Sequence, residues 1–225
     1  PVILWLVMFT GCRLIPEAWR PSIAVDLLPA LDEVFFDSSL GFPHLAAVPS
    51  TAADVLAFLP YGVLHYVSPV IFALWLWRKA SGYAAIVFLQ AFGVQNIMGV
   101  ATQVIFPSAA PWYNDLYGFA PASYSMPGNP AGLARVDKLF GTHLYTSTFG
   151  NSPLVFGALP SLHSGFAVLI MLFAMHVSRR MGSVLMIYVC WQWWATMYFR
   201  HHYMIDLVVG GTYSSAVYLL SRRYL

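Results

Sequence analysis

Charged residues are scarce in this sequence, and this scarcity argues against a soluble domain. Of the 225 residues, 9% are Asp, Glu, Lys or Arg, whereas 59% are apolar and the mean hydropathy is +0.67. Because soluble domains carry about a quarter charged residues, the sequence predicts an integral membrane protein. The net charge of +2 is too small to indicate a nucleic-acid partner.

Cysteine is also scarce, which excludes further classes. Cys12 and Cys190 both lie inside apolar runs, so a disulfide framework is not expected, and neither has metal-ligand neighbours at a typical spacing. The sequence lacks internal repeats and low-complexity tracts. It also lacks a cluster of carboxylates of the kind that holds Mg²⁺. We therefore expect no metal and no cofactor.

Long apolar runs, in contrast, are abundant. A membrane-crossing helix needs about 20 mostly apolar residues. Residues 1–12 lack the basic start and the cleavage pattern of a signal peptide, so we interpret them as the end of a truncated first membrane helix. Five further candidate segments are 55–77, 83–106, 163–178, 183–200 and 203–221. The predicted fold class is all-α: a polytopic membrane protein of about six transmembrane helices, with 1–225 as a single domain.

Two long connections join these segments. The connection 13–54 contains AVDLLPALDEVFF, whose apolar residues recur at helical spacing and predict a helix that lies flat on the membrane surface. The connection 107–160 is rich in Pro, Gly, Ser and Tyr, and loops of that length are usually functional or disordered. Both connections fall on one side of the membrane if all six segments span it.

Basic residues predict the orientation. Arg78–Lys79, Arg179–Arg180 and Arg222–Arg223 fall on the same side of the membrane if all six segments cross. The positive-inside rule makes that side cytosolic. Several basic residues on the other side break this rule, which suggests that they hold an anion: Arg13, Arg20, Arg135, Lys138 and Arg200.

The stretch GALPSLHSG (157–165) predicts a helix start on the non-cytosolic side. Pro160 favours a turn, and Ser161 is a good N-cap for a helix that carries His163 in its first turn. A helix start offers free N–H groups and a positive dipole end, which together bind phosphate. A titratable imidazole is therefore expected beside a phosphate-binding position.

The stretch RHHYMID (200–206) lies at the same membrane face. His202 and Asp206 are four residues apart, so they share one side of a helix. An unpaired carboxylate is costly near the apolar core of a membrane. We therefore expect Asp206 to pair with His202, to fix the imidazole tautomer and to stabilise the imidazolium.

Two imidazoles, one carboxylate and nearby cations suit phosphoryl transfer through a phosphohistidine. Other interpretations stay open: His163 as a hydrogen-bonded interface residue, His202 with Asp206 as a structural pair, and a zinc site made by all three. Because titratable residues gather at one membrane face and not at mid-membrane, a transporter is disfavoured. Tyr61 and His65, one turn apart, are interpreted as a polar contact between packed helices.

Several stretches resemble a known family. PSLH (160–163) and HHYMID (201–206) resemble the second and third motifs of the type 2 phosphatidic acid phosphatase superfamily. Within it, DVLAFLPYGVLHYVSP (54–69), FPSAAPWYNDLYG (106–118) and YSMPGNPAGLARVDKLFGTHLYT (124–146) resemble the fungal inositol phosphorylceramide synthases, the aureobasidin A resistance family. The resemblance covers most of the chain after residue 50.

The resemblance implies a fold, a reaction and a location. The family has a phosphatidic acid phosphatase type 2-like helical bundle and moves phosphoinositol from phosphatidylinositol to ceramide, releasing diacylglycerol. It implies His202 as nucleophile, Asp206 as the carboxylate that orients it, and His163 as acid and base. It also implies a Golgi membrane with the site and the 107–160 loop facing the lumen. The implied partners are phosphatidylinositol, ceramide, membrane lipids and a small regulatory membrane subunit.

Some positions depart from the superfamily pattern. Ala195 and Thr196 replace the Ser-Arg pair ahead of the third-motif histidine, and Leu162 replaces a glycine of the second motif. These changes disfavour a lipid phosphate phosphatase and agree with the synthase. The alternatives to the synthase are a lipid phosphate phosphatase and an inositol phosphotransferase acting on a mannosylated sphingolipid. Since the superfamily's phosphate-binding arginine is missing, other residues are expected to bind the substrate: Ser161, Arg135, Lys138 and Arg200 for the phosphate, and Asp115 and Tyr124 of the long loop for the inositol.

Overall fold

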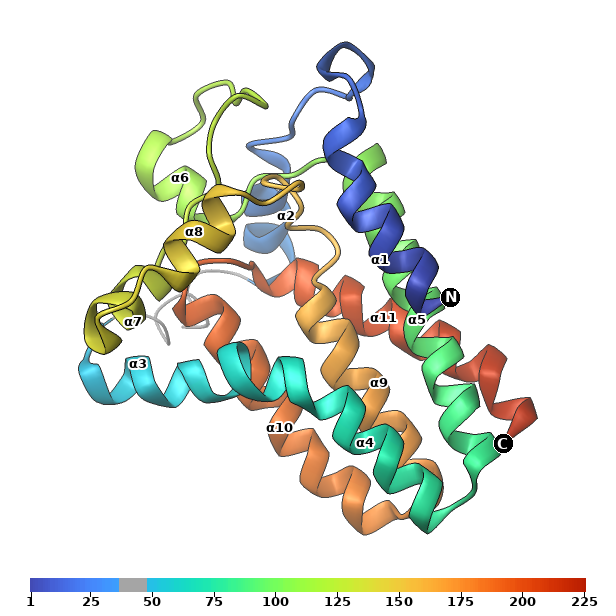
Figure 1. Cartoon of the computed structure of the whole chain (residues 1–225). Helices are drawn as coiled ribbons and strands as arrows, with labels where there is room; N and C mark the ends of the chain where they lie inside the picture. Colours follow the sequence, from blue (N-terminus) through green and yellow to red (C-terminus); the bar gives the residue numbers. More distant parts are fainter. Residues whose placement is uncertain (37–47) are drawn as a thin grey trace.

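The computed structural model describes residues 1–36 and 48–225, so the part of the 13–54 connection at 37–47 lies outside the described residues. The described residues form helices and loops (Figure 1). Two isolated bridges, Ala24 to Ser108 and Ser108 to Gly157, tie three loops together beside the bundle. The predicted all-α class is confirmed.

Helices occupy all six predicted membrane segments. They are α1 (Val2–Gly11), α4 (His65–Lys79), α5 (Gly82–Ile105), α9 (Leu162–Val177), α10 (Arg179–Tyr198) and α11 (Met204–Ser221). Three described stretches are long and apolar enough to cross a membrane: Thr51–Lys79, Gly82–Ile105 and Met204–Tyr224. Helices α1 and α9 are apolar but shorter. The count of six spans therefore stays a prediction.

The predicted 55–77 segment is not one straight helix. It is divided into α3 (Thr51–Phe58), a π-helical turn η5 (Leu59–Leu64) and α4. Figure 1 shows that α3 and α4 point in different directions from this turn. Pro60 has no N–H to continue the α-helical hydrogen bonds, and π-turns often occur at functional sites. The turn buries Tyr61 against the rest of the bundle.

Helix α9 is the central helix of the bundle. It packs against α10, α11, α4 and α5. Its contact with α5 is aromatic: Phe88 meets Phe173, and Phe92 meets Phe166, both edge to face. Because lipid tails are as apolar as the side chains, helices in a membrane associate through such close packing. The start of α9 is thereby held between its neighbours.

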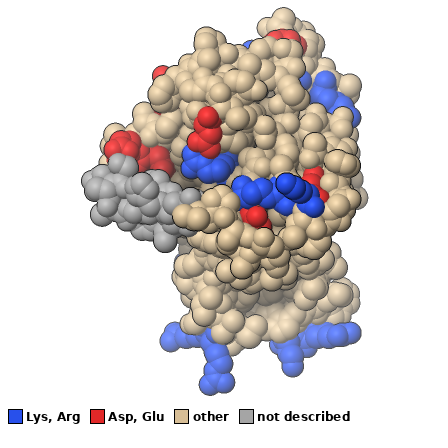
Figure 2. Space-filling view, turned by 90° about the vertical axis from the view of Figure 1, so that its left-hand side faces the viewer, with Lys and Arg blue, Asp and Glu red and all other residues tan. Residues whose placement is uncertain are grey.

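The outer faces of the bundle suit a lipid environment. Large apolar side chains lie exposed on α4 and α10: Val70, Ile71, Leu74, Trp77, Val184 and Ile187. In Figure 2, the visible face has a band free of charged side chains, and only Lys and Arg side chains are visible at its lower end. Soluble proteins rarely expose so much contiguous apolar surface. The chain is therefore an integral membrane protein.

The 107–160 connection is folded. It contains α6 (Pro111–Tyr117), α7 (Leu133–Phe140) and α8 (Leu144–Gly150), which cover the upper end of the bundle in Figure 1. Asp137 of α7 joins α7 to α8, because its carboxylate accepts hydrogen bonds from the N–H groups of Tyr145 and Thr146. The connection thus has a fixed shape over the ends of α9, α10 and α11.

Helix α2 (Leu27–Phe36) confirms the helix predicted within AVDLLPALDEVFF. Leu28 is buried with Trp112 and Tyr113 of α6. Asp32 faces α11, where its Oδ1 accepts a hydrogen bond from the N–H of Ile205 at 2.9 Å. Helix α2 therefore packs on the start of α11. Its position at the membrane surface stays a prediction.

Candidate active site

The start of α9 has the predicted N-cap. The Oγ of Ser161 accepts a hydrogen bond from the N–H of Ser164 at 3.3 Å. The N–H of Ser161 itself donates to the backbone carbonyl of Asp206 at 3.0 Å. This backbone contact joins the two sequence motifs directly, so the first turn of α9 and the first turn of α11 meet.

Small residues permit this close approach. The Oγ of Ser164 donates to the carbonyl of Leu207 at 2.5 Å, and the Oγ of Ser214 donates to the carbonyl of Gly165 at 2.6 Å. A Cβ atom at Gly210 would overlap the carbonyl oxygen of Ser161. Gly210 therefore permits close packing of α9 on α11, and this packing fixes how far His163 lies from the residues of α11.

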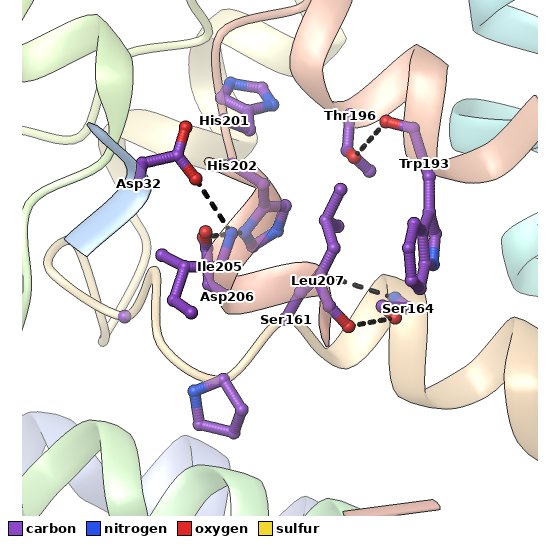
Figure 3. A network of polar contacts seen from close by, with 12 residues as sticks. Asp32, Ser161, Ser164, Trp193, Thr196, His201, His202, Ile205, Asp206 and Leu207 are labelled. Atoms are coloured by element: carbon purple, nitrogen blue, oxygen red, sulfur yellow. Dashed lines mark hydrogen bonds and ion pairs between the residues drawn. The ribbon is translucent and has the colours of Figure 1, made fainter. Parts of the chain in front are cut away.

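His202 and Asp206 form the predicted pair. The Nδ1 of His202 lies 2.7 Å from the Oδ2 of Asp206 (Figure 3). The side chain of Asp206 is fully buried, and that of His202 is 7% exposed. A carboxylate at Nδ1 holds the proton there and leaves the Nε2 lone pair available for reaction. An imidazole that serves as a nucleophile needs such a carboxylate at its other ring nitrogen.

Asp32 supports the loop that carries this pair. Within the described residues, the N-cap position of α11, Tyr203, makes no capping hydrogen bond through its side chain. The carboxylate of Asp32 from α2 accepts the N–H of Ile205 instead, as Figure 3 shows. Burial raises the pKa of Asp32, although this hydrogen bond acts in the opposite direction. Sequence reasoning missed this contact, because the two residues are 173 positions apart.

His163 lies beside the pair. The rings of His163 and His202 meet edge to face, with centroids 5.5 Å apart. Both line a cavity of about 230 Å³. The cavity is lined further by aromatic and apolar residues of several elements and by a few polar ones, among them Phe9, Tyr66, Trp112, Phe149, Leu154, Val155, Gln103, Asn129 and Thr148. Two imidazoles thus face one partly apolar cavity, at the end of the bundle opposite the basic clusters of α4, α10 and η6 (Arg222–Tyr224).

Two more histidines and a tyrosine surround His163, which sequence reasoning did not place there. The ring of Tyr61 stacks on His163 at 4.3 Å, and the ring of His65 lies 4.2 Å from it. The hydroxyl of Tyr61 lies 2.7 Å from the Nδ1 of His201. The interpretation of Tyr61 and His65 as a simple helix-packing contact is therefore incomplete. The sequence signal that could have indicated this was the spacing of Tyr61 and His65, which are four residues apart and so share one side of a helix.

The residues predicted to bind substrate have partners other than this cavity. Arg135 pairs with Asp54, with Nη2 and Oδ1 2.9 Å apart, and Arg200 forms two hydrogen bonds with Asp115. These hydrogen bonds, which Arg200 donates to the carboxylate of Asp115, raise the pKa of Arg200. Three side chains have other surroundings: Lys138 is exposed on α7, Tyr124 donates to the carbonyl of Pro21, and Ser161 caps α9. None of these six belongs to the described residues that line the cavity.

The residues of α6 that precede Asp115 differ in whether they line the cavity. Trp112 lines the cavity, whereas Tyr113 is fully buried and donates to the carbonyl of Ala120. Asn114 donates to the carbonyl of Val25 and accepts from the hydroxyl of Tyr203. Helix α6 therefore contributes one aromatic wall to the cavity, and its polar side chains hold the surrounding loops together.

The zinc alternative finds no support in the geometry. Among the described residues, no group of three or more His, Cys, Asp or Glu side chains is arranged to hold a metal ion. In His202 the Nδ1 is already engaged by Asp206. The arrangement of His163, His202 and Asp206 matches the phosphohistidine interpretation better, since the carboxylate faces an imidazole nitrogen and the second imidazole lies beside it.

Comparisons with known proteins agree with this geometry. The chain is 46% identical over 209 residues to an inositol phosphorylceramide synthase catalytic subunit of Schizosaccharomyces pombe, which covers 93% of this chain and 49% of the relative. It is 41% identical over 226 residues to an inositol phosphorylceramide synthase of Candida albicans, covering 100% of this chain and 48% of the relative. A phosphoinositol dihydroceramide synthase of Bacteroides thetaiotaomicron is 37% identical over 164 residues, which are 70% of this chain and 52% of the relative.

The matches cover most of this chain but only part of each relative. The chain spans about half the length of the curated relatives it matches. No solved structure matches the chain. The model of the PAP2 superfamily matches residues 30–220, which include α9, α10, all but the last residue of α11, and both histidine motifs. On the extent of this match, the chain belongs to the PAP2 superfamily.

Proposed function

We propose that the protein transfers phosphoinositol from phosphatidylinositol to ceramide, giving inositol phosphorylceramide and diacylglycerol. The observation that carries the proposal is the buried contact of His202 with Asp206 beside His163, in a cavity shared by both histidines. The names of the relatives support the same substrates. In this proposal His202 is the nucleophile, Asp206 orients it, and His163 is the acid–base group.

The first half-reaction uses His202 as nucleophile. Its Nε2 attacks the phosphorus of phosphatidylinositol, and Asp206 at Nδ1 stabilises the positive charge that develops on the ring. The bond between phosphorus and the diacylglycerol oxygen breaks. His163, in its protonated form, gives its proton to that oxygen. The products of this step are diacylglycerol, a phosphoinositol group on His202 and neutral His163.

The second half-reaction reverses the proton transfer. Neutral His163 takes the proton from the primary hydroxyl of ceramide, and the oxygen attacks the phosphorus. The bond between phosphorus and Nε2 of His202 breaks, so that inositol phosphorylceramide leaves and both histidines return to their starting protonation states. One acid–base residue thus serves both halves, as the reversal of the first step requires.

The lining of the cavity supports a lipid acceptor over water. Phe9, Trp112, Phe149 and Leu154 contribute apolar surface around the histidines. A site that excludes water favours attack by the hydroxyl of a bound lipid on the phosphohistidine. The folded 107–160 connection supplies three of these four side chains, which supports its proposed function as a cover for the site.

A second candidate is inositol phosphate transfer to a mannosylated sphingolipid. The observation that favours it is the similarity to an inositolphosphotransferase 1 of Saccharomyces cerevisiae, 41% identical over 142 residues, which are 60% of this chain and 27% of that relative. The same histidines and the same phosphohistidine would serve this reaction. Only the acceptor would differ.

The test uses full-length protein purified in detergent, fluorescent ceramide, and phosphatidylinositol present or absent. We expect a new polar lipid that requires phosphatidylinositol and disappears in His202→Ala, with a loss of at least about a thousandfold in Asp206→Asn. His176→Ala is the control, because His176 is exposed at the opposite end of α9. Phosphate release from phosphatidic acid without this product would establish a phosphatase. Product only with mannosylated ceramide would establish the second candidate.

We also propose that the site faces the Golgi lumen and that a small regulatory membrane subunit binds the protein. Three basic clusters at the ends of α4, α10 and α11 support the orientation, since they lie at the opposite ends of these helices from the histidines. The Golgi location and the subunit follow from the resemblance to the fungal synthases. Copurification of a small membrane protein with the full-length chain tests the subunit.

A further inference from the structure

His163 is held by rings on η5 and α4. The ring of Tyr61 stacks on it at 4.3 Å with an interplanar angle of 23°, and the ring of His65 lies 4.2 Å away at 34°. Tyr61 is 3% exposed. An acid–base imidazole must present one nitrogen to the leaving oxygen and later to the incoming hydroxyl, so the plane of its ring matters for the proposed reaction.

Tyr61 is itself held by His201. The phenol oxygen lies 2.7 Å from the Nδ1 of His201, and His201 is 5% exposed. Burial first, and the neighbouring His202 second, lower the pKa of His201 to about 3. His201 is therefore neutral at physiological pH. A neutral imidazole accepts a hydrogen bond at one ring nitrogen, so the hydroxyl of Tyr61 can donate to its Nδ1.

His201 is fixed in turn by the folded connection. Its ring stacks on Phe149 of α8 at 4.6 Å with an interplanar angle of 19°. Its backbone N–H donates to the carbonyl of Thr196 at the end of α10. A continuous series of contacts therefore runs from Phe149 through His201 and Tyr61 to His163. Neither Tyr61 nor His201 is needed as nucleophile, acid or base in the proposed reaction.

We propose that Tyr61 and His201 form a positioning pair for His163. The phenol ring sets the plane of the His163 imidazole, and the hydrogen bond to His201 sets the position of the phenol ring. The negative face of the phenol ring also stabilises the protonated form of His163 that the first half-reaction needs. The inference rests on the proposed function, because it takes His163 as the acid and base.

Two variants of Tyr61 separate the effect of its hydrogen bond from the effect of its aromatic ring. Tyr61→Phe keeps the stacked ring and removes the hydroxyl, so kcat is expected to fall about fivefold, the effect of one lost hydrogen bond. The KM values for both lipids are expected to stay within about twofold, because the hydroxyl that is removed is engaged by His201. Tyr61→Leu removes the ring as well. It is expected to lower kcat about a hundredfold and to move the alkaline limb of the pH–rate profile to lower pH, since protonated His163 loses its stabilisation.

A variant of His201 tests whether Tyr61 and His201 act through the same hydrogen bond. His201→Leu removes the acceptor, and the double variant Tyr61→Phe/His201→Leu is expected to be no slower than the slower single variant, because both substitutions remove the same interaction. Tyr218→Phe is a matched control. Its hydroxyl lies 3.4 Å from the Nδ1 of His176 at the opposite end of the molecule, so kcat and the pH profile are expected to match wild type.

Histidine ¹⁵N NMR of the full-length protein supplies a readout that does not depend on turnover. In Tyr61→Phe we expect the Nδ1 resonance of His201 to shift and that of His163 to broaden as its ring gains mobility. Unchanged resonances of both histidines would overturn the pairing, even if wild-type protein made no phosphatidylinositol-dependent product. Wild-type kcat and pH profile in Tyr61→Phe and Tyr61→Leu, with wild-type protein active, would overturn the positioning role and leave the proposed function standing.

Discussion

At the scale of single residues, the carboxylates of this protein differ in function because their partners differ. Asp206 is fully buried and faces one imidazole. Asp54 is buried between the guanidinium of Arg135 and the hydroxyl of Tyr198. Asp32 caps a helix other than its own. Only the first arrangement leaves a reactive group beside the carboxylate. Burial alone therefore does not distinguish Asp206 from the other carboxylates; the imidazole that it contacts does.

Asp137 is the carboxylate whose stabilising effect depends most clearly on pH. Burial alone would raise its pKa, but hydrogen bonds from Thr146, Tyr145 and Thr142 outweigh burial and lower the pKa to about 2. A lowered pKa means that the ionised form stabilises the fold. This contribution is complete above the ordinary pKa of 3.8 and is lost as the pH falls through about 2.

We therefore predict that Asp137→Asn destabilises the protein by about 2 kcal/mol at neutral pH, because charged hydrogen bonds to the start of α8 are lost. The difference from wild type is expected to shrink between pH 4 and pH 2. Thermal unfolding in detergent at a series of pH values measures it. Glu17→Gln is the control, since Glu17 is exposed. A difference that stays constant down to pH 2 would show that Asp137 acts through its shape and not its charge.

Sequence alone predicted the contact of His202 with Asp206, because both residues lie within one helical turn. It did not predict the contacts of Arg135 with Asp54 or of Arg200 with Asp115, whose partners are 81 and 85 residues apart. The breach of the positive-inside rule suggested anion binding, but the anions that Arg135 and Arg200 contact are carboxylates of the protein itself. In Figure 2, blue and red side chains indeed lie side by side on the upper part of the visible face.

At the scale of helices and loops, the long apolar segments were predictable and the details near the site were not. Runs of apolar residues identify α5 and α11 directly. The π-turn η5 depends on Pro60 and on packing around Tyr61, which periodicity does not report. Helices α6 and α8 have seven residues each. Helices this short form only with tertiary support, so composition predicted a loop.

The contact of α9 with α11 sets the geometry of the site, and Gly210 controls it. A Cβ atom there would overlap the carbonyl oxygen of Ser161, a backbone atom that cannot move away alone. We predict that Gly210→Ala separates the helix starts, lowers kcat about a hundredfold through displacement of His163, and destabilises the fold by about 1–3 kcal/mol.

Activity and thermal unfolding of purified protein check this prediction. Gly11→Ala is the matched control, because a Cβ atom at Gly11 meets nothing within 4 Å and Gly11 also lies in a helix. A Gly210→Ala variant with wild-type kcat would mean that the helix starts tolerate separation, and that His163 and His202 act without the close approach seen here.

At the scale of the whole molecule, the two ends of the bundle differ in chemistry. One end carries the basic residues of α4, α10 and η6 (Arg222–Tyr224), and the other carries the histidines under the folded 107–160 connection. The apolar faces between them would contact lipid. In the proposed reaction, a lipid substrate in one leaflet would present its phosphate at the histidine end while its acyl chains stay among the helices.

This division of the molecule predicts how it sits in the membrane. Moving clustered arginines and lysines across a bilayer is unfavourable, so we predict that the basic end is cytosolic and that the histidine end faces the lumen. In a background with Cys12→Ser and Cys190→Ser, we place one cysteine at each end: Lys138→Cys on α7, where Lys138 is exposed, and Arg180→Cys in the first turn of α10. Sealed microsomes are then treated with a membrane-impermeant maleimide. We expect Arg180→Cys to react at once and Lys138→Cys to react only after detergent opens the vesicles. The reverse pattern would place the histidines on the cytosolic side, and the basic residues would then have to be held in the lumen by something other than their charge.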